Sequence, residues 1–220
     1  MSEGFRLDPR AVLQVYASGA FPMAESRDSE EIFLVEPKRR GVLPLDGLKI
    51  SRSLRRTVRQ DRFQVHVDAD FEAVVDACSA PRAGSEDSWI NPLLRQLYLD
   101  LHALGVAHSV ECRQNGRLVG GLFGIALSGA FFGESMFSTA TDASKVALVH
   151  LVARLRSGGF CLLDTQFSTA HLESLGVIEI ARKDYLERLG EAMRAKGDFY
   201  CWPVAGVPGT ESLQAVSQMS

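Results

Sequence analysis

Residues 107–138 read AHSVECRQNGRLVGGLFGIALSGAFFGESMFS and contain the clearest pattern of regular structure in the chain. Asn115-Gly116 is the dipeptide most typical of a tight hairpin turn, and Ser128-Gly129 marks a second turn thirteen positions on. Three strands are therefore predicted, at residues 107–113, 118–127 and 130–138. An antiparallel meander is expected at the centre of the fold.

The segments on either side of this meander alternate between helices and strands. Helices are expected at 9–18, 52–59, 69–78 and 92–104, from an Asp142 cap to Gly158-Gly159, near His171, and from Lys183. Further strands are expected at 63–67, 160–167 and 177–180. This order predicts an α+β fold around one mixed sheet, and it resembles the order of the GNAT-like acyltransferases. Loops are expected at 25–31 and 80–87, and the polar tail after Gly206 is expected to fray.

The charge of the chain is unevenly distributed. The 220 residues carry a formal net charge of −3, yet residues 38–62 hold nine basic and two acidic side chains, so the remainder carries −10. In the expected helix 52–59, four arginines three or four positions apart share one face: Arg52, Arg55, Arg56 and Arg59. Because such a face repels itself unless it meets a polyanion, it indicates contact with nucleic-acid phosphates. The alternative is a solvated helix face.

Other features limit the class of protein. The four cysteines are widely spaced, and neither they nor the five histidines show a metal-ligand spacing, so no metal site or disulfide framework is expected. The N-terminus, MSEGFRLDPR, is polar, which predicts no signal peptide, and no apolar run approaches the length of a membrane span. A cytoplasmic protein that needs no membrane is predicted.

Three polar side chains stand out in apolar surroundings. Asp164 and Gln166 end the strand predicted at 160–167, and their spacing of two places both on one face. A carboxylate at the end of a buried strand is costly unless it is paired or used. Glu134 lies among Phe131, Phe132, Met136 and Phe137, and the same spacing rule puts Phe132, Glu134 and Met136 on one face. Glu134 beside an apolar pocket could bind a cationic group.

The residues leave two classes of protein open. The first is a CoA-dependent N-acetyltransferase on the same fold, but the segment before Asp142 reads STAT and lacks the glycine-rich loop that binds diphosphate at a helix N-terminus. The second is a non-catalytic RNA-binding module, which the arginine helix allows and which does not require Asp164 or Gln166.

Ten short motifs together resemble the bacterial leucyl/phenylalanyl-tRNA–protein transferase family. They are GAFPM (19–23), GVLP (41–44), SRSLRR (51–56), SWI (88–90), AHSVE (107–111), LVGGLFG (118–124), FGESMFS (132–138), ASK (143–145), LDTQ (163–166) and HLESLG (171–176). The resemblance runs from about Leu13 to Leu189. Two positions depart from the family pattern, because Leu34 and Arg113 stand where the family usually has Trp.

The resemblance implies a reaction and a domain plan. Such an enzyme moves Leu, Phe or Met from aminoacyl-tRNA to the α-amine of proteins that begin with Lys or Arg, and thereby marks them for N-degron degradation. It uses no CoA or other cofactor. The implied plan is a small N-terminal domain at 1–37 and a GNAT-like aminoacyltransferase domain at 38–220.

The resemblance also implies site residues. Asp164 and Gln166 would be catalytic, with Gln166 orienting the amine, and Glu134 would lie at the aminoacyl and acceptor site. An apolar pocket for the amino-acid side chain would be lined by Phe131, Met136, Leu148, Leu155 and Leu163. The 3′-terminal adenosine would be held by Tyr16, Met23, Trp89 and Tyr98. The tRNA phosphates would contact Arg52, Arg55, Arg56 and Arg59.

Overall fold

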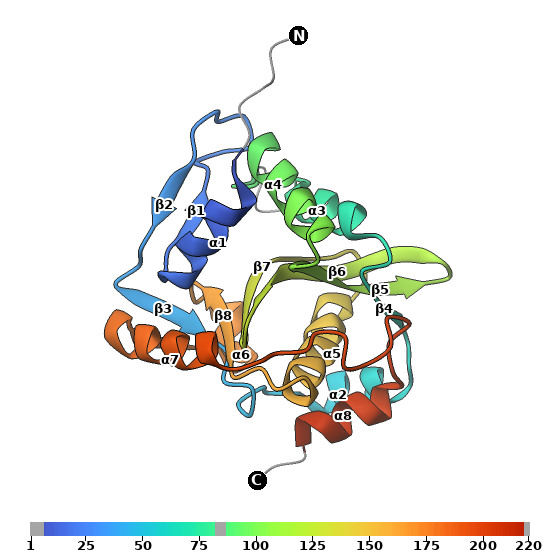
Figure 1. The fold of residues 1–220 in the computed structure, drawn as a ribbon. Coiled ribbons are helices and arrows are strands. Elements are labelled where there is room, and N and C mark those ends of the chain that lie inside the picture. The colour runs from blue at the N-terminus through green and yellow to red at the C-terminus, as the bar shows by residue number, and fades with distance from the viewer. Residues whose placement is uncertain (1–6, 82–86, 218–220) are drawn as a thin grey trace.

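Seven strands form one mixed sheet through the middle of the molecule, in the order β4-β5-β6-β7-β8-β3-β9 (Figure 1). The structure is a computed structural model that describes residues 7–81 and 87–217. The strands are β3 (Arg39–Val42), β4 (Gln64–Val67), β5 (Ala107–Gln114), β6 (Arg117–Leu127), β7 (Ala130–Ser138), β8 (Leu162–Gln166) and β9 (Ile178–Ala181). The predicted α+β class with a mixed sheet is confirmed.

Helices cover both faces of this sheet. They are α1 (Pro9–Ala17), α2 (Arg52–Arg59), α3 (Phe71–Ser79), α4 (Pro92–Ala103), α5 (Ala143–Ser157), α6 (Ala170–Ser174), α7 (Arg182–Arg194) and α8 (Gly209–Ser217). One apolar cluster joins α1, α3, α4 and α7 to one face, and a second cluster joins α2, α5 and α8 to the other (Figure 1). The layered arrangement buries the apolar residues of β5, β6 and β7 on both sides.

The central meander forms as its turns predict. Asn115 and Gly116 both have positive φ, 51° and 74°, which is the geometry of a type I′ turn between β5 and β6. The residues of β5 pair antiparallel with β6, and those of β6 pair antiparallel with β7. The three strands lie within one residue of their predicted limits.

β7 and β8 are the parallel pair of the sheet, and α5 connects them. Only three residue pairs align, from Ala130↔Leu162 to Phe132↔Asp164, although β7 continues to Ser138. The two strands therefore separate beyond Phe132 and Asp164. This separation places the ends of β7 and β8 at the candidate site.

Helices α1, α2, α4 and α6 each begin after a residue whose side chain accepts a backbone N–H of the first turn, whereas α3, α5 and α7 do not. Ser51 accepts the N–H of Leu54 at the start of α2, whose limits are those predicted. Asp142, the expected cap of α5, has φ of 70° and instead forms an ion pair with Lys145. Ser138 supplies an oxygen to the first turn of α5 by accepting the N–H of Ser144.

Three short strands were not predicted. β1 (Phe21–Met23) and β2 (Phe33–Val35) form a separate two-stranded sheet, and β3 inserts between β8 and β9. β1 and β2 have only three residues, too few to show a period-two pattern, and β3 begins with two arginines and a glycine, so only tertiary pairing reveals them. Residues 25–31 form the predicted loop between β1 and β2, whereas most of the loop predicted at 80–87 lies outside the described residues.

The expectation of a frayed tail after Gly206 is wrong. Residues Gly209–Ser217 form α8, which packs against α5 and α2. Leu213 is 5% exposed in the second apolar cluster, and Ser212 Oγ lies 3.0 Å from His150 Nδ1. A nine-residue helix with few apolar side chains has a weak sequence signal, and its stability comes from packing.

We expect Leu213→Ala to lower the free energy of unfolding by about 2–5 kcal/mol, because it leaves a cavity between α8 and α5. Gln214→Ala, on the exposed side of the same helix, is the control and should change stability little. Urea unfolding followed by circular dichroism measures both. Equal stability of the two variants would mean that α8 does not contribute to the fold.

Candidate active site

A buried ion pair lies at the end of β8. The guanidinium of Arg40, on β3, donates to the carboxylate of Asp164 from Nε, at 2.9 Å to Oδ1 and 3.1 Å to Oδ2, and from Nη2 at 2.7 Å to Oδ2. The two side chains are 1% and 0% exposed. The hydroxyl of Tyr185 on α7 donates a further hydrogen bond to Oδ2 at 2.7 Å. Asp164 is therefore paired, as a carboxylate at this position has to be.

Arg40 connects this carboxylate to the N-terminal segment. Its Nη1 donates to the carbonyl of Gly19 at 3.1 Å, and its Cζ lies 4.5 Å from the ring centre of Phe21 and 4.6 Å from that of Tyr185. Burial alone would lower the pKa of the guanidinium, but the hydrogen bonds and charge of Asp164 raise the Arg40 pKa above its usual value. The guanidinium of Arg40 therefore stays charged although it is buried.

Asp164 also fixes the backbone of Gln166. Its Oδ1 accepts the Gln166 backbone N–H at 2.8 Å, and Gln166 adopts φ of 56°, in the left-handed region that non-glycine residues seldom occupy. As predicted, the two side chains lie on one face, while Thr165 lines a cavity on the other. Gln166 Nε2 points to Glu134, with a long contact of 3.5 Å to Oε1.

Glu134 sits between two tyrosines. The hydroxyl of Tyr16 donates to Oε1 and that of Tyr98 to Oε2, each at 2.8 Å. Removal from water raises the pKa of the Glu134 carboxyl to about 7, and the charge of Asp164 adds to this, whereas the two tyrosine hydrogen bonds and Arg40 oppose it. The carboxyl therefore titrates near neutral pH. Burial, and next the charge of Glu134, raise the pKa of both tyrosine hydroxyls, so both remain donors.

The prediction that Phe132, Glu134 and Met136 share one face of a strand is wrong, because β7 contains a β-bulge. Gly124 of β6 pairs with Gly133 and Phe123 pairs with Ser135, so Glu134 is an extra residue in β7. Beyond it the alternation is reversed: Phe132 packs in the first apolar cluster and Met136 against the second. Glu134 and Met136 therefore project to opposite faces.

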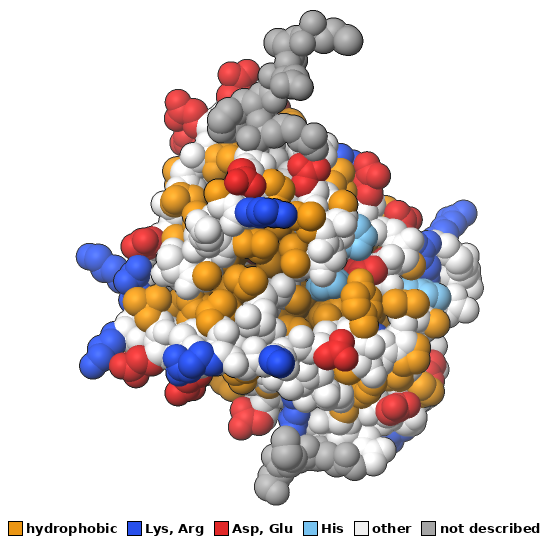
Figure 2. All heavy atoms as spheres, in the orientation of Figure 1, with side chains coloured by type: hydrophobic (Ala, Val, Ile, Leu, Met, Phe, Trp, Pro, Cys, Tyr) orange, Lys and Arg blue, Asp and Glu red, His pale blue; other side chains and the backbone are white. Residues whose placement is uncertain are grey.

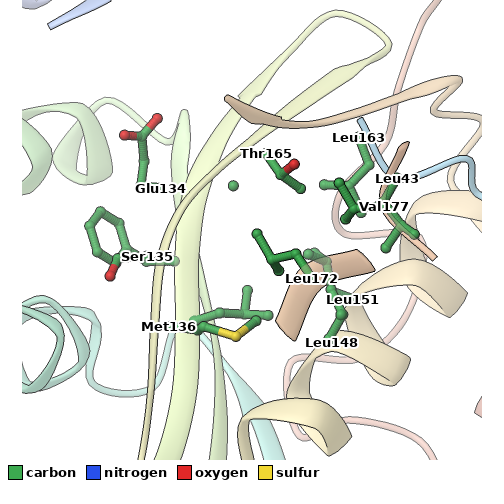
Figure 3. A pocket seen from close by; sticks show the side chains of 13 residues that line it. Leu43, Glu134, Ser135, Met136, Leu148, Leu151, Leu163, Thr165, Leu172 and Val177 are labelled. Atoms are coloured by element: carbon green, nitrogen blue, oxygen red, sulfur yellow. The ribbon is translucent and has the colours of Figure 1, made fainter. Parts of the chain in front are cut away.

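An apolar cavity of about 110 Å³ lies beside Glu134, between β7 and β8. Its volume is close to that of a cavity of roughly 150 Å³ that accepts one benzene ring, so it suits a single apolar side chain. Figure 3 shows leucines and Val177 around the space, with the carboxylate of Glu134 directed away from it. The lining includes Leu43, Met136, Leu148, Leu151, Leu163, Leu172 and Val177.

The structure brings together three of the five predicted pocket residues. Met136, Leu148 and Leu163 line the cavity, whereas Phe131 and Leu155 are fully buried in the second cluster and do not. The ring of Phe131 stacks on that of Phe199, with the ring centres 5.6 Å apart. Leu151 was not among the predicted residues, although it lies one turn after Leu148. The other unpredicted lining residues, such as Leu43 and Val177, come from segments that only the fold brings near the cavity.

The four residues expected to hold adenosine lie in two kinds of environment. Tyr16 and Tyr98 are 0% exposed and use their hydroxyls on Glu134, so neither offers a free ring face. Trp89 and Met23 are partly exposed, and Trp89 lies edge-on to Tyr98 at 6.3 Å between ring centres. Only Trp89 and Met23 are therefore accessible to a base.

The exposed basic surface is smaller than the basic segment 38–62 from which it was predicted. Arg52, Arg56 and Arg59 of α2 are exposed and Arg55 is half-buried, and none of the four makes an ion pair with another described residue. Arg40, in contrast, is buried against Asp164. The sequence could not distinguish the two groups, because burial of an arginine requires a partner far along the chain.

Two kinds of feature are absent from residues 7–81 and 87–217. No group of three or more His, Cys, Asp or Glu side chains is arranged to hold a metal ion there. No helix in the same ranges has the length and apolarity required to cross a membrane.

Comparison with known proteins gives a consistent result. The family model described as leucyl/phenylalanyl-tRNA protein transferase matches residues 42–190. Relatives named leucyl/phenylalanyl-tRNA–protein transferase include one from Maricaulis maris, 55% identical over 95% of this chain and 96% of its own length, and one from Caulobacter vibrioides strain NA1000 / CB15N, 54% identical over both full lengths. The chain therefore belongs to the leucyl/phenylalanyl-tRNA–protein transferase family.

One solved structure is also similar. "The structure of L-PGS from Bacillus licheniformis" covers 77% of this chain and 55% of that chain, with 12% identity and a TM-score of 0.40.

The raised pKa of Glu134 predicts a pH-dependent stability. The folded state holds this proton more tightly than the unfolded chain, whose glutamate has an ordinary pKa near 4.5. Stability contributed by the protonated form is therefore lost as pH rises from about 4.5 to about 7, and is constant above that. Glu134→Gln should lack this component, so the difference in unfolding free energy between variant and wild type should grow across that window. If the unfolding free energies of wild type and Glu134→Gln instead change with pH in parallel, the pKa of Glu134 in the folded protein is ordinary.

Proposed function

We propose that the protein transfers an aminoacyl group from tRNA to the α-amine of an acceptor protein at the Glu134–Gln166 site. The observation that carries this assignment is the apolar, side-chain-sized cavity lined in part by Glu134 and by Thr165, the neighbour of Gln166. Family membership supports the reaction class. The donors would be Leu-, Phe- and Met-tRNA, and the acceptors proteins that begin with Lys or Arg.

The reaction requires positioning more than activation. The acceptor nitrogen forms a bond to the ester carbonyl carbon, and the bond between that carbon and the tRNA ribose oxygen breaks. The nitrogen loses a proton, which is taken up by the ribose oxygen. An α-amine has a pKa of about 7.7–8.0, so part of it is neutral near pH 7. Gln166 Nε2 points to Glu134, which leaves Gln166 Oε1 to accept a hydrogen bond from the amine.

Asp164 acts as a positioning residue in this scheme. Its oxygens are occupied by Arg40, Tyr185 and the backbone N–H of Gln166. It therefore acts by holding Gln166 in its left-handed conformation, and not by polarising the Gln166 side-chain amide directly. Its negative charge also favours positive charge on the attacking nitrogen.

The cavity accounts for mixed donor use. Leucines, Val177 and flexible Met136 line it, without a charged side chain projecting into it. An apolar pocket discriminates by only about 1–3 kcal/mol per methylene, so Leu, Phe and Met can all be accepted. The terminal adenosine would meet Trp89 and Met23, and the phosphates of the acceptor stem would meet α2.

The remaining expectations form part of the same proposal. The splayed parallel pair β7 and β8, connected by α5, supports a GNAT-like catalytic domain at 38–220 with a smaller N-terminal domain at 1–37. The cellular role would be to mark proteins for N-degron degradation in the cytoplasm. CoA-dependent acetyl transfer is less well supported, because Ser138 already accepts the Ser144 N–H at the N-terminus of α5 and Ala143 packs against Gly120.

Transfer should be measured with Phe-tRNA and a peptide that begins with Arg, with acetyl-CoA as the alternative donor. We expect phenylalanyl transfer from tRNA and a large loss in Gln166→Ala, which keeps the Arg40–Asp164 pair. Asp164 variants are less informative, because breaking a buried pair costs about 3–5 kcal/mol of stability. Transfer from acetyl-CoA alone, or full activity in Gln166→Ala, would contradict the assignment.

We expect Arg52→Glu combined with Arg56→Glu to weaken tRNA binding and to flatten its dependence on salt. Each lost phosphate contact lowers the slope of log affinity against log salt by about 1, so two should lower it by about 2. Filter binding at several salt concentrations measures the slope. An unchanged slope would identify α2 as a solvated face.

A further inference from the structure

The β1–β2 hairpin has an exposed outer surface, formed by residues 25–36. Phe33 and Leu34 of β2 are 48% and 59% exposed, which is unusual for two adjacent large apolar side chains. Among the described residues, β2 pairs only with β1, so its other edge is open. An open edge beside apolar side chains is a template for an added strand. We call residues 25–36 the hairpin surface.

A groove lies over one face of the hairpin, where Leu7, α1 and α4 border it on the other side. It has a volume of about 460 Å³, and its lining includes Pro22, Glu30, Glu31, Ile32, Leu34 and Leu93. Pro22 pairs with Leu34 across the two strands, so the groove lies on the hairpin face opposite Phe21. Its size and apolar floor suit several side chains of a bound chain and not a single small group.

The hairpin surface is strongly acidic. Its five carboxylates are all exposed: Glu25, Asp28, Glu30, Glu31 and Glu36, of which Glu36 pairs with Arg182 at 3.0 Å. Its one basic residue, Arg27, donates to the carbonyl of Ser79. Figure 2 shows acidic side chains beside apolar ones over this end of the molecule. Such a surface repels nucleic-acid phosphates and attracts a basic polypeptide.

The hairpin surface is also placed next to the candidate active site and away from the arginine helix. Phe21 of β1 packs edge-on against Phe167, the residue after Gln166, with ring centres 5.6 Å apart. One further strand spacing of about 4.8 Å separates β1 from β2, and another separates β2 from a strand added at its edge. The added strand would lie roughly 15 Å from Phe167, which about five extended residues can span. In Figure 1, α2 lies at the opposite end of the molecule from β1 and β2.

We propose that the acceptor polypeptide, beyond its reacting N-terminus, docks in extended form on the hairpin surface. Its backbone pairs with the free edge of β2, its apolar side chains contact Phe33 and Leu34, and its basic side chains face the carboxylates. This inference rests on the proposed function. It means that the acceptor chain and the body of the tRNA approach from opposite ends, with only the terminal adenosine reaching Trp89 and Met23. It also means that the enzyme prefers acceptors with basic and apolar residues shortly after the N-terminus.

The test compares a short acceptor with a long one. The short acceptor is an arginyl dipeptide, and the long one is a ten-residue peptide that begins with Arg and alternates Val and Lys. In Glu30→Lys combined with Glu31→Lys, we expect KM for the long peptide to rise about tenfold, with KM for the dipeptide and for aminoacyl-tRNA unchanged. Leu34→Asp should act in the same direction. All three positions are exposed, so the fold is retained.

The control is Glu187→Lys combined with Glu191→Lys, an equal charge change on the exposed side of α7. It should leave KM for the long peptide unchanged. Direct binding of the long peptide, labelled at its C-terminus and measured by fluorescence anisotropy without tRNA, separates docking from catalysis. If no acceptor reacts but the peptide binds wild type and not the hairpin variants, the proposed function fails and the docking surface stands.

Three outcomes would overturn the docking proposal. The first is equal binding of the long peptide by wild type and both hairpin variants. The second is improved peptide binding on deletion of residues 1–6, which would mean that the chain's own N-terminus occupies the groove. The third is a dimer, seen by sedimentation, that Leu34→Asp dissociates, which would assign the free edge to a second copy.

Discussion

The buried ion pair between Arg40 and Asp164 is the interaction on which the site depends. An isolated charge in this position would cost many kcal/mol, so each side chain requires the other. Because Arg40 also binds the carbonyl of Gly19, and Asp164 binds the Gln166 backbone, the pair joins the N-terminal segment to the catalytic strand. The geometry of Gln166 is thus determined by residues more than a hundred positions away.

The second constraint is the separation of β7 from β8. The bulge at Glu134 directs that carboxylate toward Tyr16 and Tyr98, while Met136 projects to the opposite face and lines the cavity. A regular strand would have placed both side chains on one face. One extra residue therefore gives the protein a polar, pH-sensitive group and an apolar pocket on either side of the same strand.

Charge is separated along the molecule in a way that matches two unlike substrates. Helix α2, which carries the exposed arginines, lies at one end of the molecule, and the β1–β2 hairpin, whose loop carries the carboxylates, lies at the other, with β7 and β8 between them (Figure 1). In the proposed arrangement, the body of a polyanionic donor and a basic acceptor chain approach one site over different surfaces. The net charge of −3 conceals this arrangement because the two ends nearly cancel.

The sequence by itself determined the central meander, most helices and the shared face of Asp164 and Gln166, because turns, caps and strand alternation are local. The bulge that turns Glu134 away from Met136 arises only where β7 pairs with β6. The arginine face of α2 was equally readable, since four side chains within eight residues need no distant partner. Only the tertiary structure decided that Arg40 is a buried ion-pair partner, that Tyr16 and Tyr98 hold Glu134, and that the tail forms α8. Each of these depends on contacts between segments far apart in the chain, and burial, which decides whether a charge is solvated or paired, exists only once those segments meet.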